Sequence, residues 1–395
     1  MADVAGSQSY YKKSVDSAAA RRRRRNQLRR KRRSPEEGEA LPTDQEEEED
    51  DDDEGRDLAP GTEAAVVARR KAVPVPDPGA VAVAGRQRTM EDAVTVWMDL
   101  CSPLITGCLP VHYFAIYDGH GGSHFSTVCR QKMHEIFKEE LMGEADDPPP
   151  APAPPGFAVD EGLLKEAWRV LISRVFARTE TVALDTCSCG SEGFECGCDR
   201  DSISYSGTTA VAALMTDHHI VVGNCGDSRA VLYRAGHVVP LSFDHKPGRA
   251  DEKARIQASG GQVVNTDTER VDGILAMSRA IGDVFLKPSV ISEPDMTLTK
   301  RIHDEDEFVI VASDGMWDVI PMEMAGRVAR HCLSEPPGSG ARLSEYEVMT
   351  NTEALSSRSA CAASVLTRLA LARSSVDNIS IVVIDLKGMS VGDEH

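Results

Sequence analysis

Four aspartates stand at the ends of apolar runs that are typical of β-strands, and together they could bind metal ions. Asp118 follows FAIY, Asp227 follows VVGNCG, Asp314 follows FVIVAS, and Asp377 precedes NISIVVI. A carboxylate at the end of a buried strand is costly unless it is paired or bound to a cation. No lysine or arginine is adjacent to these positions. Ligands that are all oxygen favour Mg²⁺ or Mn²⁺ over zinc.

Each aspartate taken alone is more typical of a turn or a cap than of a metal ligand. Because the same arrangement of strand and aspartate occurs four times, binding of a cation is favoured over four unrelated turn residues. Gly119, which has no Cβ, could turn its carbonyl toward an ion, and the glycines that follow let the chain pass close to it. His120 lies within the same DGHGG loop and could act as a proton donor.

The aspartates must be held by strands and helices. Runs rich in valine and isoleucine predict strands at 81–85, 113–119, 208–215, 219–226, 230–236, 308–315 and 379–386. Helical patterns cover 123–142, 161–181, 250–259, 322–333 and 360–374. We expect 219–226 and 230–236 to form a hairpin that turns at 226–228. Hairpin strands with helices grouped between them favour an antiparallel α+β layer fold over a doubly wound parallel sheet.

Composition separates a tail from a folded domain. Residues 1–78 are predicted to be disordered, since they hold ten basic residues within 21–33 and nine consecutive acids at 46–54. The predicted domain spans 79–387, and a short tail, 388–395, follows it. Three segments read as insertions: 143–158, 183–204 and 335–358. The basic run is either a nuclear-import signal or a solvated arm.

Net charge restricts the partners. The whole chain carries −19, from 44 basic and 63 acidic residues. The tail holds 16 basic and 18 acidic residues, so the remainder has 44 − 16 = 28 against 63 − 18 = 45, a net charge of −17. Such acidity argues against nucleic acid or a membrane as the main partner. No apolar run approaches bilayer length, the N-terminus shows no signal peptide, and ten cysteines in so long a chain favour reduced thiols.

A series of motifs resembles the metal-dependent type 2C protein serine/threonine phosphatases, and within them the plant group of abscisic acid signalling. The motifs occur in the order of that family and extend over roughly 79–387. They are MEDAV (90–94), FAIYDGHGG (114–122), SGTTAV (206–211), NCGDSRAVL (224–232), LSFDHKPGRADEKARI (241–256), LAMSRAIGD (275–283), EFVIVASDGMWDV (307–319) and DNISIVV (377–383).

The resemblance implies a central antiparallel β-sandwich flanked by helices on both sides, in four layers. It implies that Asp118 bridges two Mg²⁺ or Mn²⁺ ions, that the Gly119 carbonyl binds one of them, and that Asp314 and Asp377 complete the pair. The two ions share a water, lower its pKa and direct it at phosphorus.

Further roles also follow from the resemblance. Glu91 and Asp92 would hold waters bound to the metals, Asp227 and Asp318 would form a weaker third site, and His120 would protonate the leaving seryl or threonyl oxygen. The implied substrates are phosphoserine and phosphothreonine on proteins, and Snf1-related kinases in particular. The implied role is negative regulation of abscisic acid stress signalling.

Two positions depart from the family pattern. Gln87 stands where the family usually has a phosphate-binding arginine, and Arg86 and Arg88 flank it. Either a neighbouring arginine takes over the phosphate, or the enzyme is weakened. Thr266 stands where the abscisic acid group has the flap tryptophan that inserts toward the hormone-bound receptor. Loss of such an interface anchor predicts weak or absent inhibition by hormone receptors.

Four cysteines form a separate pattern, C-x-C-x6-C-x-C, at Cys187, Cys189, Cys196 and Cys198. They could bind a structural Zn²⁺ through four thiolates, form a redox disulfide, or remain free thiols in a disordered loop. One-residue spacing is less usual for zinc than two-residue spacing.

The sequence therefore predicts a Mg²⁺- or Mn²⁺-dependent protein serine/threonine phosphatase that acts in the nucleus, with the cytosol as a second location. One rival is an inactive scaffold of the same fold that binds a kinase, which Gln87 favours and the full set of predicted ligands opposes. The other rival, a nucleic-acid-binding protein based on the basic run, is opposed by the acidic domain.

Overall fold

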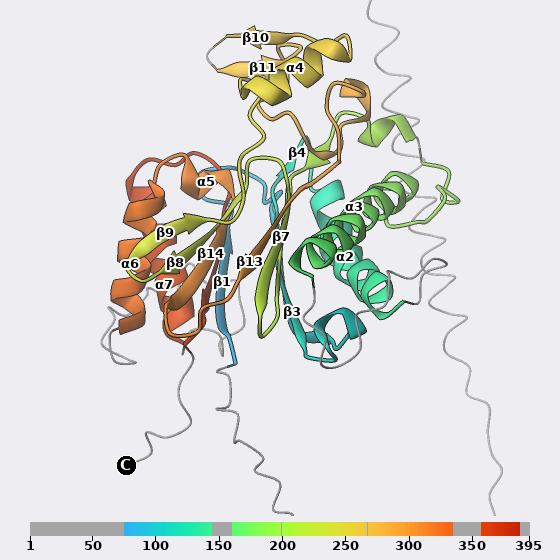
Figure 1. Ribbon diagram of the computed structural model, residues 1–395. Coiled ribbons are helices and arrows are strands. Elements are labelled where there is room, and N and C mark those ends of the chain that lie inside the picture. Colours follow the sequence, from blue (N-terminus) through green and yellow to red (C-terminus); the bar gives the residue numbers. More distant parts are fainter. Residues whose placement is uncertain (1–74, 144–159, 199, 267, 335–356, 388–395) are drawn as a thin grey trace, which may run out of the picture. The chain divides into compact units, whose positions relative to one another are not determined.

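Two five-stranded antiparallel sheets form the centre of the computed structural model, which describes residues 75–143, 160–198, 200–266, 268–334 and 357–387 (Figure 1). The first sheet has the order β1-β15-β14-β8-β9. Its strands are β1 (Asp77–Val83), β15 (Ile379–Asp385), β14 (Asp306–Ala312), β8 (Arg229–Arg234) and β9 (His237–Pro240). The second has the order β13-β7-β6-β3-β2. Its strands are β13 (Asp295–Lys300), β7 (His219–Cys225), β6 (Ala210–Met215), β3 (Val111–Tyr117) and β2 (Ala93–Cys101).

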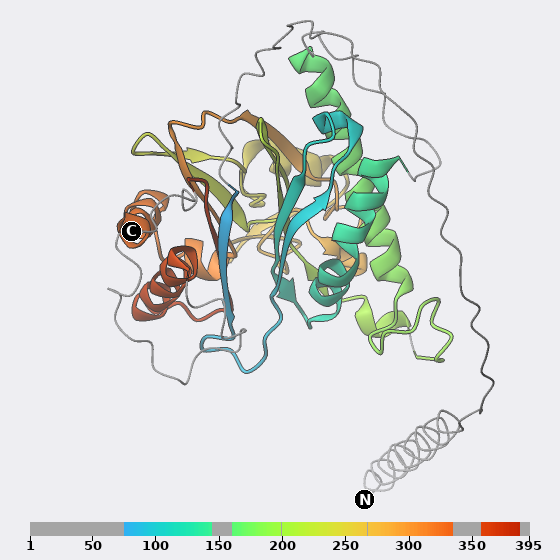
Figure 2. The ribbon, with the colours of Figure 1, turned by 90° about the horizontal axis from the view of Figure 1, so that it is seen from below.

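Helices cover the outer face of each sheet (Figure 2). The helices α2 (His124–Met142) and α3 (Glu161–Asp185) pack on the second sheet through residues that include Phe137, Trp168 and Phe176. The helices α6 (Met322–Ser334) and α7 (Arg358–Ala372) pack on the first sheet. Within the described residues, no helix combines the length and the apolar character that crossing a membrane requires.

The layers follow from strand alternation, because successive side chains point to opposite faces of a sheet. Along β3, Tyr113, Ala115 and Tyr117 contact the α2–α3 layer, whereas Phe114 and Ile116 lie between the two sheets. The inter-sheet core receives Val309, Val311, Val382 and Ile384 from the first sheet. The predicted four-layer α+β sandwich is therefore confirmed.

Smaller elements lie at one end of the sandwich. A three-stranded sheet joins β4 (Gly119–His120), β5 (Gly207–Thr208) and β12 (Ile281–Gly282). The helix α4 (Ala250–Ala258) is followed by the hairpin of β10 (Val263–Asn265) and β11 (Glu269–Val271). The short helix α5 (Asp314–Trp317) follows β14 directly. The described residues also include 3₁₀ turns at Arg200–Ile203 and Val284–Leu286, and one at Leu104–Thr106 in the connection from β2 to β3.

The predicted hairpin of 219–226 and 230–236 is wrong. The strand β7 pairs with β6 and β13, and β8 pairs with β14 and β9, so the two strands belong to different sheets. The segment 226–228 therefore crosses from one sheet to the other. Each strand has one face in the inter-sheet core and the other face against a helix layer, and the apolar run of such a strand does not reveal which sheet it joins.

Only some of the predicted domain boundaries fall within the residues that the structure describes. The first strand begins at Asp77, two residues before the predicted start at 79, and the last described residue is Lys387. The predicted tails, 1–78 and 388–395, lie wholly or almost wholly outside the described residues, as do most of the insertions 143–158 and 335–358. The segment 183–204 begins within α3, which extends to Asp185.

Candidate active site

Six aspartates meet at the end of the sandwich where β4 lies. Asp118 directly follows β3, Asp227 lies in the crossover from β7 to β8, and Asp377 lies two residues before β15. The electrostatic interactions of Asp118 with Asp92, Asp227, Asp314 and Asp377 place these carboxyl groups near one another. We call the following set the acidic cluster: Asp92, Asp118, Asp227, Asp314, Asp318 and Asp377.

The pKa values report how unfavourable this arrangement is for a metal-free protein. Burial of its carboxyl group, and then the charges of the neighbouring aspartates, hold the pKa of Asp118 well above its ordinary value. Burial followed by the charges of Asp227 and Asp318 does the same to the pKa of Asp314. Burial raises the pKa of Asp92 to about 6, although the hydrogen bond that Ser313 donates to it opposes this. The cluster thus concentrates more negative charge than it can stabilise alone.

A lysine does approach the acidic cluster, contrary to the expectation from sequence adjacency. The Nζ atom of Lys246 donates to Oδ2 of Asp227 at 2.5 Å. Burial lowers the pKa of Lys246, but the charges of Asp227, Asp314 and Asp318 outweigh it and raise that pKa. Lys246 comes from the loop between β9 and α4, so adjacency in sequence could not show it.

One lysine does not satisfy the cluster. Lys246 interacts with only three of the six carboxyl groups, those of Asp227, Asp314 and Asp318. Arg229, whose charge also reaches Asp227 and Asp318, is engaged by both carboxylate oxygens of Asp244 at 2.8 and 2.6 Å. Among the described residues, Asp92 and Asp227 each bury one carboxylate oxygen that has no hydrogen-bond donor. Buried carboxylate oxygens that repel one another and accept no hydrogen bond are the ligands that hard divalent cations prefer. The residues present therefore fit Mg²⁺ or Mn²⁺.

Hydrogen bonds hold the turn at 84–91 against the start of β15. The buried side chain of Asn378 donates to the carbonyls of Ala84 and Thr89, both at 3.0 Å, and its Oδ1 accepts from the N–H of Glu91 at 2.7 Å. Asn378 is adjacent to Asp377. It thereby fixes Glu91 and Asp92 relative to an aspartate far away in sequence.

Glu91 and Asp92 reach different neighbours. Glu91 Oε2 accepts from the N–H of Gly122 at 3.0 Å, so it holds the DGHGG loop. Asp92 Oδ2 accepts from Ser313 Oγ at 3.0 Å, next to Asp314. A Cβ on Gly119 would lie 2.4 Å from the Glu91 carbonyl oxygen, so this position requires glycine. The two acids thus position the loop and the cluster.

The small sheet positions His120. His120 Nε2 lies 2.8 Å from Oδ2 of Asp283, an almost fully buried residue just after β12. The strand β5 lies beneath this pair, where a Cβ on Gly207 would be 2.2 Å from Asp283 Oδ2. His120 Nδ1 has no partner among the described residues. Asp283 was not singled out from the sequence, although it ends the motif LAMSRAIGD.

The two arginines beside Gln87 differ. The guanidinium of Arg86 donates to the carbonyls of Leu371, at 3.0 Å, and Ser375, so it ties the turn to the end of α7. Arg88 is exposed and forms no hydrogen bond or ion pair with any other residue that the structure describes. Arg88 is therefore the free cation of the two, within three residues of Glu91.

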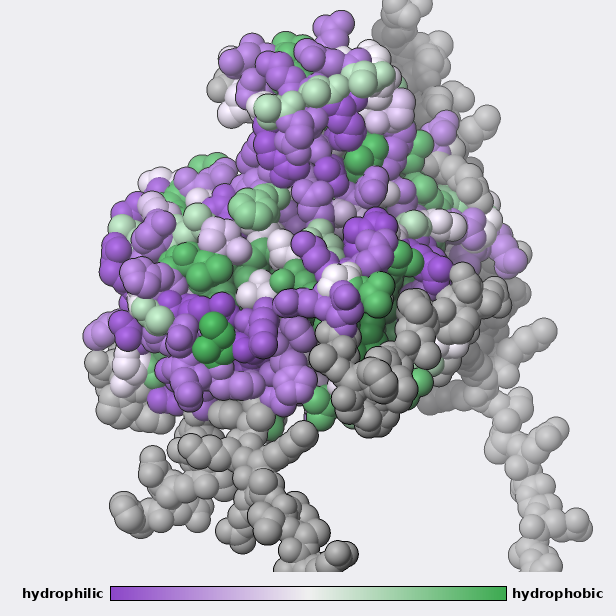
Figure 3. All heavy atoms as spheres, in the orientation of Figure 1, coloured by the Kyte–Doolittle hydropathy of each residue, from purple (hydrophilic) through white to green (hydrophobic). Residues whose placement is uncertain are grey.

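Figure 1 shows the β10–β11 hairpin beside α4. Thr266 is exposed and lies at the tip of this hairpin. Its N–H donates to the Thr268 carbonyl at 3.2 Å. The surface of this region is mostly hydrophilic on the face that Figure 3 shows.

Comparisons with known proteins agree on one family. The family model described as protein phosphatase 2C matches residues 77–379. Probable protein phosphatase 2C 75 of Arabidopsis thaliana is 48% identical over 314 residues, which are 79% of this chain and 74% of that protein. Probable protein phosphatase 2C 9 of rice (Oryza sativa subsp. japonica) is 43% identical over 333 residues, covering 78% of this chain and 75% of that protein.

Solved structures agree in fold. A serine-threonine phosphatase 2C from Toxoplasma gondii superimposes with a TM-score of 0.56 at 19% identity, covering 80% of this chain and 96% of that one. A sex-determining protein of C. elegans gives a TM-score of 0.55 at 21% identity, covering 79% of this chain and 65% of that one.

Proposed function

Since the chain belongs to the protein phosphatase 2C family and is a protein serine/threonine phosphatase, we propose that it works with two Mg²⁺ or Mn²⁺ ions held by the acidic cluster. Dependence on these metals is general in the family. The observation that carries the proposal is the convergence of six carboxyl groups. Burial, and then the charges of neighbouring aspartates, raise the pKa values of Asp118 and Asp314 in this cluster. The direct ligands would be Asp118, the Gly119 carbonyl, Asp314 and Asp377, and Asp227 with Asp318 would form a third, weaker site.

The other residues of the site serve the phosphoprotein substrate. When bound, such ions lower the pKa of a water molecule and neutralise charge on phosphoryl oxygens. His120 donates a proton to the leaving seryl or threonyl oxygen, and Asp283 holds the orientation of its ring. Arg88 binds the phosphate, because the guanidinium of Arg86 is already engaged by backbone carbonyls. Glu91 and Asp92 orient waters of the ions.

The physiological role that we propose is negative regulation of abscisic acid stress signalling, with Snf1-related kinases as substrates and the nucleus, besides the cytosol, as the location. The resemblance of the motifs to the plant group of abscisic acid signalling supports the role, and the basic run at 21–33 supports the nucleus. Thr266 in place of the flap tryptophan supports weak or absent inhibition by hormone receptors.

Phosphate release from a phosphothreonine peptide tests the activity. We expect release with Mn²⁺ or Mg²⁺, none with EDTA, and none from Asp118→Ala protein shown to be folded by circular dichroism. Folded wild-type protein that releases no phosphate with either metal would instead support the kinase-binding scaffold that Gln87 allows.

The receptor proposal has a separate test. Hormone-loaded receptor should leave the wild-type enzyme active at concentrations that silence a relative with the flap tryptophan, and Thr266→Trp should gain inhibition. Equal inhibition of wild type and Thr266→Trp would refute the role given to this position.

A further inference from the structure

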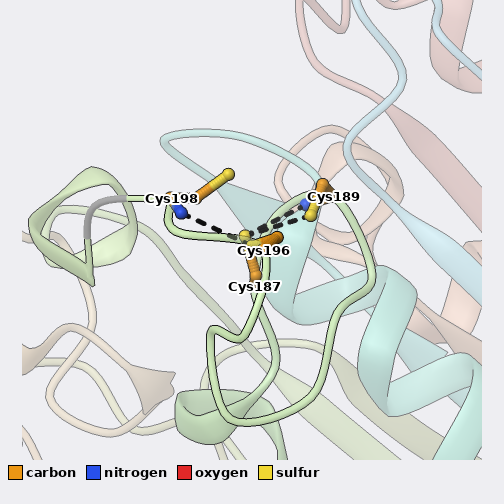
Figure 4. A group of neighbouring side chains, drawn as sticks. All are labelled: Cys187, Cys189, Cys196 and Cys198. Atoms are coloured by element: carbon orange, nitrogen blue, oxygen red, sulfur yellow. Dashed lines mark hydrogen bonds between the residues drawn. The ribbon is translucent and has the colours of Figure 1, made fainter. Parts of the chain in front are cut away.

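The four cysteines of the loop between α3 and the 3₁₀ turn at Arg200–Ile203 converge on one point (Figure 4). The Sγ atoms of Cys187, Cys189, Cys196 and Cys198 all lie within 4.8 Å of one another. All four are free thiols. Residues 186–198 are called the cysteine loop below. None of these residues has a role in the proposed phosphatase site.

The distances suit a tetrahedral metal ion. Zinc–thiolate bonds of about 2.3 Å place the sulfur atoms of a tetrahedral site about 3.8 Å apart. The Sγ atoms of Cys187 and Cys189 are 3.3 Å apart, and the largest separation in the group is no more than 4.8 Å. Shifts of about 1 Å or less therefore suffice to form four equal bonds. A single disulfide would account for two of the thiols and not for the meeting of all four.

The backbone of the cysteine loop is organised in the same way at both C-x-C pairs. The N–H of Cys189 donates to Sγ of Cys187 at 3.5 Å, and the N–H of Cys198 donates to Sγ of Cys196 at 3.4 Å. N–H groups directed at sulfur stabilise thiolates and orient them toward a metal.

Tight turns place these pairs. Gly190 and Gly197 have φ values of 85° and 75°, and their N–H groups donate to the carbonyls of Cys187 at 2.7 Å and Phe194 at 3.0 Å. The loop has little core of its own, since its buried side chains are Cys187 and Phe194, which pack among α2 and α3 residues. An insertion with so few apolar contacts is of the kind that a structural metal stabilises.

We infer that the cysteine loop binds one structural Zn²⁺ through the thiolates of Cys187, Cys189, Cys196 and Cys198. Four sulfur ligands select zinc over the hard ions that suit the acidic cluster, so the chain has two metal sites of opposite chemistry. On binding, each thiol loses its proton to solvent as a Zn–S bond forms, and no electron is transferred.

The position of the loop gives the zinc a role in the architecture of the active site. The chain runs from the cysteine loop to β5, and on the way the Ser206 carbonyl accepts from the N–H of Asp283 at 2.9 Å. A Cβ on Gly121 would lie 2.5 Å from the carbonyl oxygen of Tyr205, so this segment also packs closely on the DGHGG loop. The zinc would thus fix the segment that leads to β5 and contacts both Asp283 and the DGHGG loop of His120.

Metal analysis of the full chain tests the inference. The protein is purified without chelator, dialysed against excess Mg²⁺ to displace zinc from the acidic cluster, and its zinc is measured by mass spectrometry. We expect one zinc per chain in the wild type. The double variant Cys189→Ser, Cys196→Ser should lose the zinc. Both thiols are exposed, so their replacement leaves the core intact. The matched control Cys101→Ser, Cys361→Ser, which changes two thiols elsewhere, should keep it.

A spectroscopic readout is independent of purification history. Metal-free protein to which Co²⁺ is added should show the charge-transfer and ligand-field bands of a tetrahedral cobalt–thiolate centre, and the double variant should not. Wild-type protein without zinc and without these bands, or zinc that persists in the double variant, would overturn the inference. Metal-free protein whose intact mass shows a disulfide within the loop would overturn it as well.

Discussion

Replacing Asp92 by asparagine should stabilise the metal-free protein, even though it damages the site. Burial raises the pKa of Asp92 from 3.8 to about 6. Each pKa unit corresponds to about 1.4 kcal/mol, so the ionised carboxylate destabilises the metal-free fold by about 3 kcal/mol near neutral pH. Asparagine removes the charge and keeps an oxygen that can accept from Ser313. We therefore expect Asp92→Asn to raise the free energy of unfolding by about 3 kcal/mol in EDTA.

The pH dependence follows from the same pKa. The folded protein binds more protons than the unfolded chain between the two pKa values, so this group's contribution to stability falls as pH rises from about 4 to about 6. Below that window Asp92 is protonated in both states and the variant has no advantage. Above it the full difference of about 3 kcal/mol is present.

Urea denaturation in EDTA at several pH values measures this difference, with Asp304→Asn, at an exposed position, as the control. Saturating Mn²⁺ should stabilise the wild type more than the variant and reduce the gap. A variant no more stable than wild type in EDTA, or a gap that does not change between pH 4 and pH 7, would refute the reasoning that the buried carboxylate of Asp92 destabilises the metal-free fold.

Four further variants test individual contacts. Asn378→Ala removes three hydrogen bonds worth about 1 kcal/mol each, so urea denaturation should show a loss of about 3 kcal/mol in the free energy of unfolding. Activity of this variant should require a higher concentration of Mn²⁺. Unchanged stability would contradict the role of Asn378 in holding the turn at 84–91. Asparagine tolerates the φ of 48° at position 283, so Asp283→Asn should keep the backbone as it is. This variant should lower kcat at least tenfold with little change in KM. An unchanged kcat would contradict the role of Asp283 in holding His120. Arg88→Ala should lower kcat/KM for a phosphopeptide about tenfold or more, whereas Arg86→Ala should mainly lower stability, and the reverse result would exchange their roles.

The α+β class and the aspartates of the acidic cluster at strand ends could be predicted because their signals are local, whereas the four-layer arrangement was implied by the family resemblance. Buried strands such as β3, β14 and β15 are continuous apolar runs, and an aspartate at the end of each stands out against them. The strands β2 and β13 were missed because they are edge strands with half-exposed side chains, which weakens their pattern.

The remaining contacts depend on long-range geometry. His120 and Asp283 are 163 positions apart, and Glu91 and Asn378 are 287 apart, so neither pair has a signal in the order of residues. The same holds for the ion pair of Lys246 with Asp227. The C-x-C pattern predicted a candidate metal site, but only folding shows that both pairs meet at one point.

Binding of Mn²⁺ to the full chain, measured by calorimetry beside phosphate release in the same samples, tests the central claim most directly. We expect the wild type to bind at least two ions, with activity rising as the sites fill, and Asp118→Ala to lose both the tight binding and the activity while it remains folded. Phosphate release that persists in the presence of excess chelator, or Mn²⁺ binding that Asp118→Ala leaves unchanged, would contradict the account.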